Sequence, residues 1–157
     1  MAEGEFALVH KYLEIAINKT AVWVGEHDLY AMLADAAAQQ REESALQKYA
    51  PLAEEFASRY DHKLYQAIAY RAWGVAHQLA GRYDEAKGRL KRALELFETL
   101  DTRWQIGRTL FELGELALRS HPENEAAREY FSRALAAFEE MGALPDATRT
   151  REKLTAL

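Results

Sequence analysis

Apolar residues in the middle of the chain recur at spacings of three and four positions, which is the period of an amphipathic helix. One such segment carries Tyr70, Trp73, Val75, Ala76 and Leu79, and the next carries Ala86, Leu90, Ala93, Leu94 and Phe97. Gly81 separates the two segments, and acidic residues soon follow it, as at the positive end of a helix dipole. The pattern predicts a helix, a tight turn and a second helix.

This two-helix unit recurs along the sequence at an offset of 40 residues. The small residues that align are Ala34, Gly74 and Gly114 in the first helices, then Ala53, Ala93 and, one residue late, Ala134 in the second helices. The late position follows a turn at residues 120–124 that is longer than its counterpart at residues 80–82. Asp101 and Gly142 close two of the units. Such a repeat predicts units that stack side by side around a continuous core.

The repeats divide the chain into one domain with five parts. We expect an N-terminal helix in residues 1–26, repeats at 27–61, 62–101 and 102–143, and a capping helix at 144–157. Pro51 lies in the second helix of the first repeat, so we expect a kink near Gln47 or a break there. The fold class we predict is all-α: a right-handed α-α superhelix of about three helix-turn-helix repeats with capping helices at both ends and no strand.

Composition narrows the range of partners. The chain has 157 residues, 49% of them hydrophobic, which is enough to bury a genuine core. Its formal charge is −5, and positive and negative residues are intermixed along the sequence. The sequence therefore shows no basic patch that would bind the phosphate backbone of a nucleic acid. No apolar run approaches the roughly 18 residues of a membrane span. There is no cysteine, which fits a reducing compartment. We therefore expect a cytoplasmic protein without nucleic-acid or membrane partners.

The second and third units resemble the tetratricopeptide repeat. The residues that carry the resemblance are Tyr70, Trp73, Gly74, His77, Ala86, Leu90 and Ala93, and then Leu110, Leu113, Gly114, Ala127, Phe131 and Ala134. The run Gly-Arg-Tyr-Asp-Glu-Ala from Gly81 to Ala86 is similar to the turn between the two helices of that family. An offset of 40 residues exceeds the usual 34, so the resemblance is to a long-repeat variant. Such variants look like regulatory modules of bacterial proteins.

The resemblance implies that the first helices of successive repeats line a concave groove. The partner-binding residues implied by their places in the repeat are Asp28, Asp35, Arg71, Val75, Gln78, Arg108, Phe111, Glu115 and Arg119. We expect Arg71 and Arg108 to be exposed there and to pair acidic side chains of a partner, with Phe111 supplying apolar area. Asp35 and Val75 replace the polar residues with which some family members grip a C-terminal carboxylate, so a clamp of that kind is not supported.

Few residues suggest catalysis or metal binding. His10 with Glu14, and the run Glu26-His27-Asp28, each lack a third ligand at defined spacing, so we predict no metal site and no cofactor. We interpret His77 as a packed histidine and the aromatic residues, Phe111 excepted, as core. No phosphate-binding loop or nucleophile motif occurs, and we do not expect an enzyme.

The function expected from the sequence is a protein–protein interaction module that binds a peptide segment of a partner in the groove, in a regulatory or scaffolding role. The alternative is a structural domain that self-associates, for example as a homodimer, and takes no peptide ligand.

Overall fold

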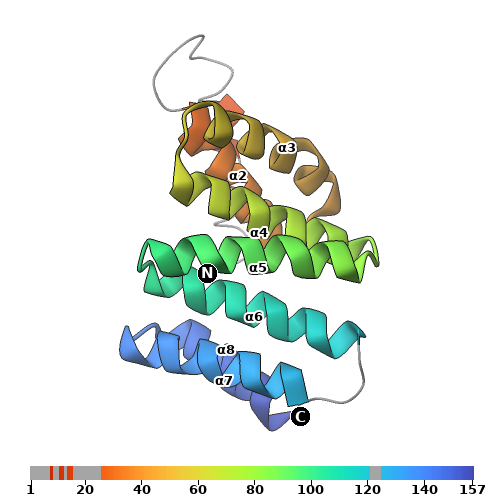
Figure 1. Cartoon of the computed structure of the whole chain (residues 1–157), viewed down its shortest axis with the longest axis vertical. Coiled ribbons are helices and arrows are strands. Elements are labelled where there is room, and N and C mark those ends of the chain that lie inside the picture. Colours follow the sequence, from red (N-terminus) through yellow and green to blue (C-terminus); the bar gives the residue numbers. More distant parts are fainter. Residues whose placement is uncertain (1–7, 9–10, 13, 16–25, 121–124) are drawn as a thin grey trace.

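The computed structural model describes residues 8, 11–12, 14–15, 26–120 and 125–157 of the chain, and these residues form helices joined by short turns (Figure 1). The helices are α2 (Glu26–Gln40), α3 (Glu43–Arg59), α4 (Lys63–Leu79), α5 (Tyr83–Thr99), α6 (Arg103–Ser120), α7 (Glu125–Glu140) and α8 (Leu144–Thr155). No strand occurs in the described part of the chain. The predicted all-α solenoid is therefore confirmed.

The helices pack as successive antiparallel pairs. The pairs α2–α3, α4–α5 and α6–α7 stack along the long axis of the molecule, and α8 packs against α7 at one end (Figure 1). The first helix of one pair also contacts the first helix of the next, as α2 does with α4 and α4 does with α6. The inner sides of the first helices therefore face one another across a common surface.

The described turns share one backbone conformation at the end of the preceding helix. One residue in each has positive φ: Arg41 (53°), Asp61 (50°), Gly81 (73°), Asp101 (48°) and Gly142 (66°). The amide of the next residue donates a hydrogen bond five residues back, as from Arg82 N to the His77 carbonyl at 2.9 Å. This arrangement satisfies the last carbonyls of the helix and reverses the chain.

Close contact between the helices of a pair depends on glycine. A Cβ placed on Gly74 would lie 2.5 Å from Leu90 Cγ, and one on Gly114 would lie 2.6 Å from Phe131 Cε1. Leu90 and Phe131 have no exposed surface. Two of the aligned small residues, Gly74 and Gly114, are thus points where a large side chain of the second helix packs against the backbone of the first.

The expected break at Pro51 is wrong. Helix α3 runs without interruption from Glu43 to Arg59 and contains Pro51. The proline ring is on the exposed side of the helix, whereas Tyr49, Ala50 and Ala53 on either side of it are buried. Packing on both sides of the proline therefore holds the helix together despite the missing backbone donor.

The expected N-terminal helix lies mostly outside the described residues. The described positions, which are Leu8, Lys11, Tyr12, Glu14 and Ile15, are helical. The Glu14 carboxylate accepts hydrogen bonds from Lys48 Nζ at 3.0 Å and from the Tyr49 hydroxyl, both on α3.

Candidate functional site

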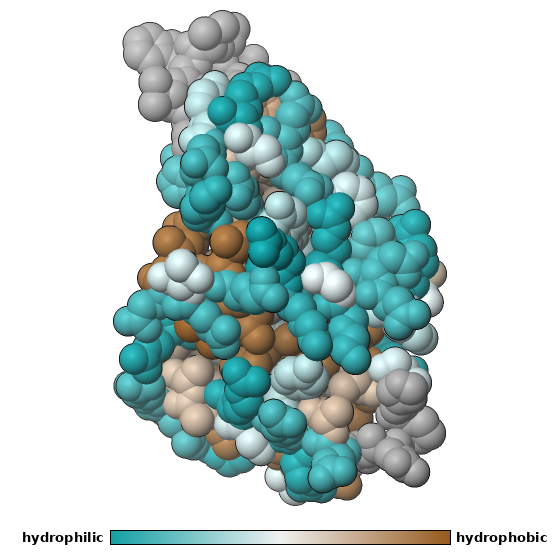
Figure 2. All heavy atoms as spheres, in the orientation of Figure 1, coloured by the Kyte–Doolittle hydropathy of each residue, from teal (hydrophilic) through white to brown (hydrophobic). Residues whose placement is uncertain are grey.

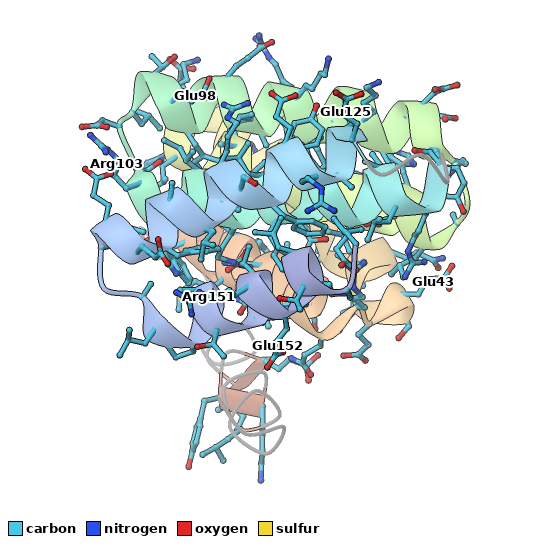
Figure 3. The ribbon with its side chains drawn as sticks, turned by 90° about the horizontal axis from the view of Figure 1, so that it is seen from below. Glu43, Glu98, Arg103, Glu125, Arg151 and Glu152 are labelled. Atoms are coloured by element: carbon cyan, nitrogen blue, oxygen red, sulfur yellow. The ribbon has the colours of Figure 1, made fainter. Side chains whose placement is uncertain are left out.

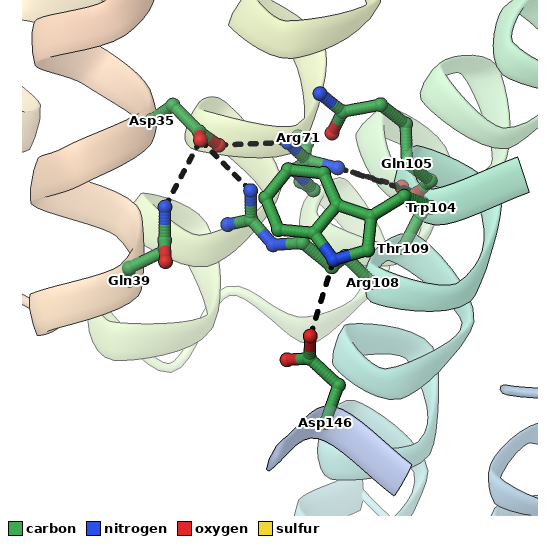
Figure 4. A network of polar contacts seen from close by, with 8 residues as sticks. All are labelled: Asp35, Gln39, Arg71, Trp104, Gln105, Arg108, Thr109 and Asp146. Atoms are coloured by element: carbon green, nitrogen blue, oxygen red, sulfur yellow. Dashed lines mark hydrogen bonds and ion pairs between the residues drawn. The ribbon is translucent and has the colours of Figure 1, made fainter. Parts of the chain in front are cut away.

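The first helices of the three pairs, α2, α4 and α6, meet at one carboxylate. Asp35 of α2 accepts a hydrogen bond from Arg71 of α4 at 2.7 Å and another from Arg108 of α6 at 2.8 Å. Figure 4 shows both guanidinium groups in contact with this carboxylate. Gln39, one turn further along α2, donates its amide to the same carboxylate at 3.0 Å. The inner surface is therefore bridged by side chains that are 36 and 73 residues apart in sequence.

Arg71 is the most deeply buried residue of this cluster. Arg71 is 1% exposed, and its guanidinium also faces the Gln105 carbonyl oxygen at 3.3 Å and stacks over the Phe97 ring at 5.1 Å. Burial on its own would raise the pKa of Asp35, but the two arginines hold that pKa well below its ordinary value. Burial and the neighbouring Arg108 lower the pKa of Arg71 to about 10, so it stays charged at neutral pH.

A second bridge crosses the same surface from the turn between α2 and α3. Arg41, which has a positive φ of 53°, donates to Glu112 of α6 at 2.8 Å and to Gln78 of α4 at 3.3 Å. Glu115, one turn further along α6, pairs with Lys153 of α8 at 2.7 Å. These contacts tie the turn after α2 to α4 and α6, and tie α6 to α8.

A hollow remains open between α2, α6 and α8, and α7 contributes one residue, Phe138, to its walls. Its walls are formed by Gln39, Arg108, Phe111, Glu112, Phe138, Asp146 and Arg149. Phe111 and Phe138 are buried and form an aromatic wall, with Phe111 set edge-on against Phe131 at 5.3 Å. Trp104 stands beside the hollow, 39% exposed, and donates its indole N–H to Asp146 of α8 at 3.1 Å. The hollow therefore combines an apolar wall with charged groups at its margin.

The structure places the predicted groove residues in three environments. Arg71, Val75, Gln78, Phe111 and Glu115 are buried; Asp28, Asp35 and Arg108 are half-buried; and Arg119 is exposed. The expectation that Arg71 and Arg108 lie exposed is wrong, because both are used to neutralise Asp35. Phe111 was expected to be available to a ligand, but only 5% of it is exposed, so it contributes a wall rather than a free surface.

The sequence interpretation missed the residues that surround the hollow, namely Arg41, Trp104, Glu112, Asp146 and Arg149. The sequence pattern predicts Trp104 as a core aromatic residue and the last helix, now α8, only as a cap. A signal for one of them was present, since Arg149 follows Arg108 by 41 residues, the offset that also separates Ala134 from Ala93. Arg149 therefore occupies in α8 the place that Arg108 occupies in α6.

Other candidate chemistry finds little support in the part of the chain that the structure describes. No group of three or more potential metal ligands occurs among those residues. His10 and the side chains of Glu26 and His27 lie outside them. His77 is half-buried and stacks on Trp73 at 5.5 Å; burial, aided by Arg82 and Arg89, lowers its pKa. No described helix is long and apolar enough to cross a membrane.

Stacked helix pairs with small-residue contacts define a helical-repeat solenoid, and comparison with known proteins identifies the repeat. Residues 65–140 match the family model of the tetratricopeptide repeat. This match supports an assignment of the chain to the tetratricopeptide repeat family.

One similar solved structure extends this likeness over nearly the whole chain. It is the crystal structure of BtubC (BKLC) from P. vanneervenii, with a TM-score of 0.61 and 17% sequence identity, over 98% of this chain and 73% of that chain. At that identity the likeness concerns the fold alone. No curated protein matches the chain significantly.

Proposed function

We propose that this chain is an interaction module that binds a peptide segment of a partner protein, and that the segment lies over the hollow between α2, α6 and α8. Tetratricopeptide repeats generally mediate protein–protein interaction, and their helical folds are typically not enzymes. The observation that carries the proposal is the hollow itself, which combines a wall of Phe111 and Phe138 with charged groups and the exposed indole of Trp104. Such a mixture suits a peptide with both apolar and charged side chains.

The closed part of the inner surface limits where a peptide can bind. Around Asp35 the guanidinium groups are already paired, and replacing those pairs would leave buried charges without partners. Exposed groups near the hollow include Trp104 at one end of α6 and Arg149 on α8, and Arg119 is exposed at the other end of α6. The site proposed here is therefore displaced from the middle of the predicted groove toward the C-terminal end of the stack.

Capture of partners from the source cell tests the proposal. The purified chain would be immobilised, and bound proteins would be identified by mass spectrometry for the wild type, Trp104→Ala and Arg119→Glu. The matched controls are Lys91→Glu on α5 and Arg128→Glu on α7, which are exposed residues of second helices. We expect the two α6 variants to lose the partner and the controls to keep it.

Two results would contradict this function. Equal loss of the partner in the α6 variants and the controls would move the site to the outer surface. A stable dimer in light scattering that forms equally in all the variants, together with no captured partner, would instead support the self-associating structural domain. The role that we propose for such a module is regulatory or scaffolding, in the cytoplasm.

A further inference from the structure

One cation beside the hollow is not engaged by any carboxylate of the described residues. Arg149 of α8 is exposed, and its guanidinium carbon lies 4.4 Å from the centroid of the Phe111 ring. Among the residues that the structure describes, none forms an ion pair or a hydrogen bond with its charged end, and the Phe111 ring is the contact that orients it. A guanidinium that rests on an aromatic face keeps its N–H donors free for a ligand.

The other charged groups around the hollow are already occupied. Arg108 pairs with Asp35, Arg41 with Glu112, and Lys153 with Glu115. Asp146 accepts the indole N–H of Trp104 at 3.1 Å.

This surface therefore differs in charge from the molecule as a whole. Its cations are Arg41, Arg71, Arg108, Arg149 and Lys153, and its carboxylates are Asp35, Glu112, Glu115 and Asp146. The cations exceed the carboxylates by one, whereas the chain carries a formal charge of −5. Within the walls of the hollow, Arg108 and Arg149 balance Glu112 and Asp146, and Arg108 and Glu112 are already paired with Asp35 and Arg41. The attraction for an anion therefore comes from the guanidinium of Arg149 and not from a net positive charge of the hollow.

Helix α8 is held firmly enough to position this guanidinium. Lys153 ties α8 to α6, and Arg151 of α8 bonds Glu139 of α7 at 2.5 Å. Figure 3 views the molecule from the end that α7 and α8 form, where Arg151 is labelled on α8. A cation whose helix is fixed before binding loses little freedom when a ligand arrives.

We infer that the hollow between α2, α6 and α8 is a carboxylate subsite, in which Arg149 selects an aspartate or glutamate side chain of the bound peptide. The methylene groups of that side chain lie against Phe111, and the carboxylate accepts two N–H bonds from the guanidinium. The residues of the walls all lie within helices, so side chains rather than a backbone nest hold the anion. This arrangement favours an acidic side chain over a peptide C-terminus, which backbone nests commonly capture.

This inference rests on the proposed peptide function, and a selection from displayed random peptides tests both. The wild type, Arg149→Glu, Arg128→Glu and Trp104→Ala would each be used as bait, after melting curves confirm that each is folded. Arg149 and Arg128 are exposed, so both reversals are expected to leave the fold intact. We expect the wild type to enrich peptides with an acidic residue at one position and Arg149→Glu to enrich a basic residue at that position.

Binding measurements on the selected peptides complete the test. For a wild-type peptide, Arg149→Glu should raise the Kd about tenfold or more, equivalent to about 1.4 kcal/mol, while Arg128→Glu should leave it unchanged. Amidation of the peptide's C-terminus should change nothing, and a loss of binding would assign the subsite to a terminal carboxylate and overturn the side-chain inference.

Two further outcomes separate the inference from the proposed function. Peptides that lose affinity in Trp104→Ala but keep it in Arg149→Glu would overturn the carboxylate subsite and leave the peptide-binding function standing. Failure to select any peptide, or selection of the same peptides by all four baits, would overturn both.

Discussion

Substitution of Gly114 by alanine tests the packing of the helix pairs most directly. The added Cβ would lie 2.6 Å from Phe131 Cε1 and 2.8 Å from both Cδ1 and Cζ, whereas carbon atoms pack at about 3.5–4.0 Å. The Phe131 ring is fully buried and set against Phe111, so it has little room to retreat. Overpacking of this kind lowers the free energy of unfolding by about 1–3 kcal/mol. The better helix propensity of alanine raises it by at most about 1 kcal/mol.

A matched substitution in the same fold should have the opposite sign. Gly88 lies inside α5 and is exposed, and a Cβ added there would have no atom within 4 Å apart from its chain neighbours and the backbone of its own helix. Gly88→Ala should therefore raise the free energy of unfolding by about 0.8–1.0 kcal/mol through helix propensity alone. In a chain of this size 1 kcal/mol corresponds to roughly 2–4 °C in Tm. We expect Gly88→Ala to raise the Tm by about that amount and Gly114→Ala to lower it.

Thermal unfolding followed by circular dichroism at 222 nm, with urea unfolding as a second measurement, would detect both changes. The double variant Gly114→Ala/Phe131→Leu should lose less stability than the two single losses added together, because the smaller side chain relieves the clash. A Gly114→Ala protein as stable as Gly88→Ala would refute the close contact between α6 and α7.

Three further predictions concern the buried charges and the turns. Arg71→Glu should lower the free energy of unfolding by about 3–5 kcal/mol, measured in urea, because it leaves Asp35 buried beside a like charge; a loss below about 0.5 kcal/mol would show that Arg71 is a surface residue. The pKa of Asp35 in the folded protein is lower than its ordinary 3.8, so its contribution to stability is present above that pH and declines as the pH falls below it. The stability difference between wild type and Asp35→Asn should thus be largest near neutral pH and shrink in acid, and a difference that grows in acid would contradict the ion pairs. Gly81→Ala should cost about 1 kcal/mol or more, since its φ of 73° suits glycine, and an unchanged Tm would contradict that turn.

The sequence by itself determined the helices and their pairing. Three- and four-residue spacing of apolar positions is a local property, and so is the turn at Gly81, where glycine adopts positive φ without strain. The aligned small residues Gly74 and Gly114 also indicated where two helices approach closely, because an added side chain could not fit there. Repetition made each of these signals stronger, and the all-helical repeat fold followed from them.

The tertiary structure alone decided which inner residues are available to a partner. Position within a repeat placed Arg71 on the inner surface, but its burial depends on Asp35, which is 36 residues away and close enough to pair only after α2 and α4 have packed. The continuous path of α3 through Pro51 likewise depends on packing that local preferences do not contain. Long side chains such as Arg41 and Arg149 reach across the surface from a turn and from a terminal helix. Their contacts depend on the relative placement of helices far apart in sequence, which a local periodic pattern does not specify.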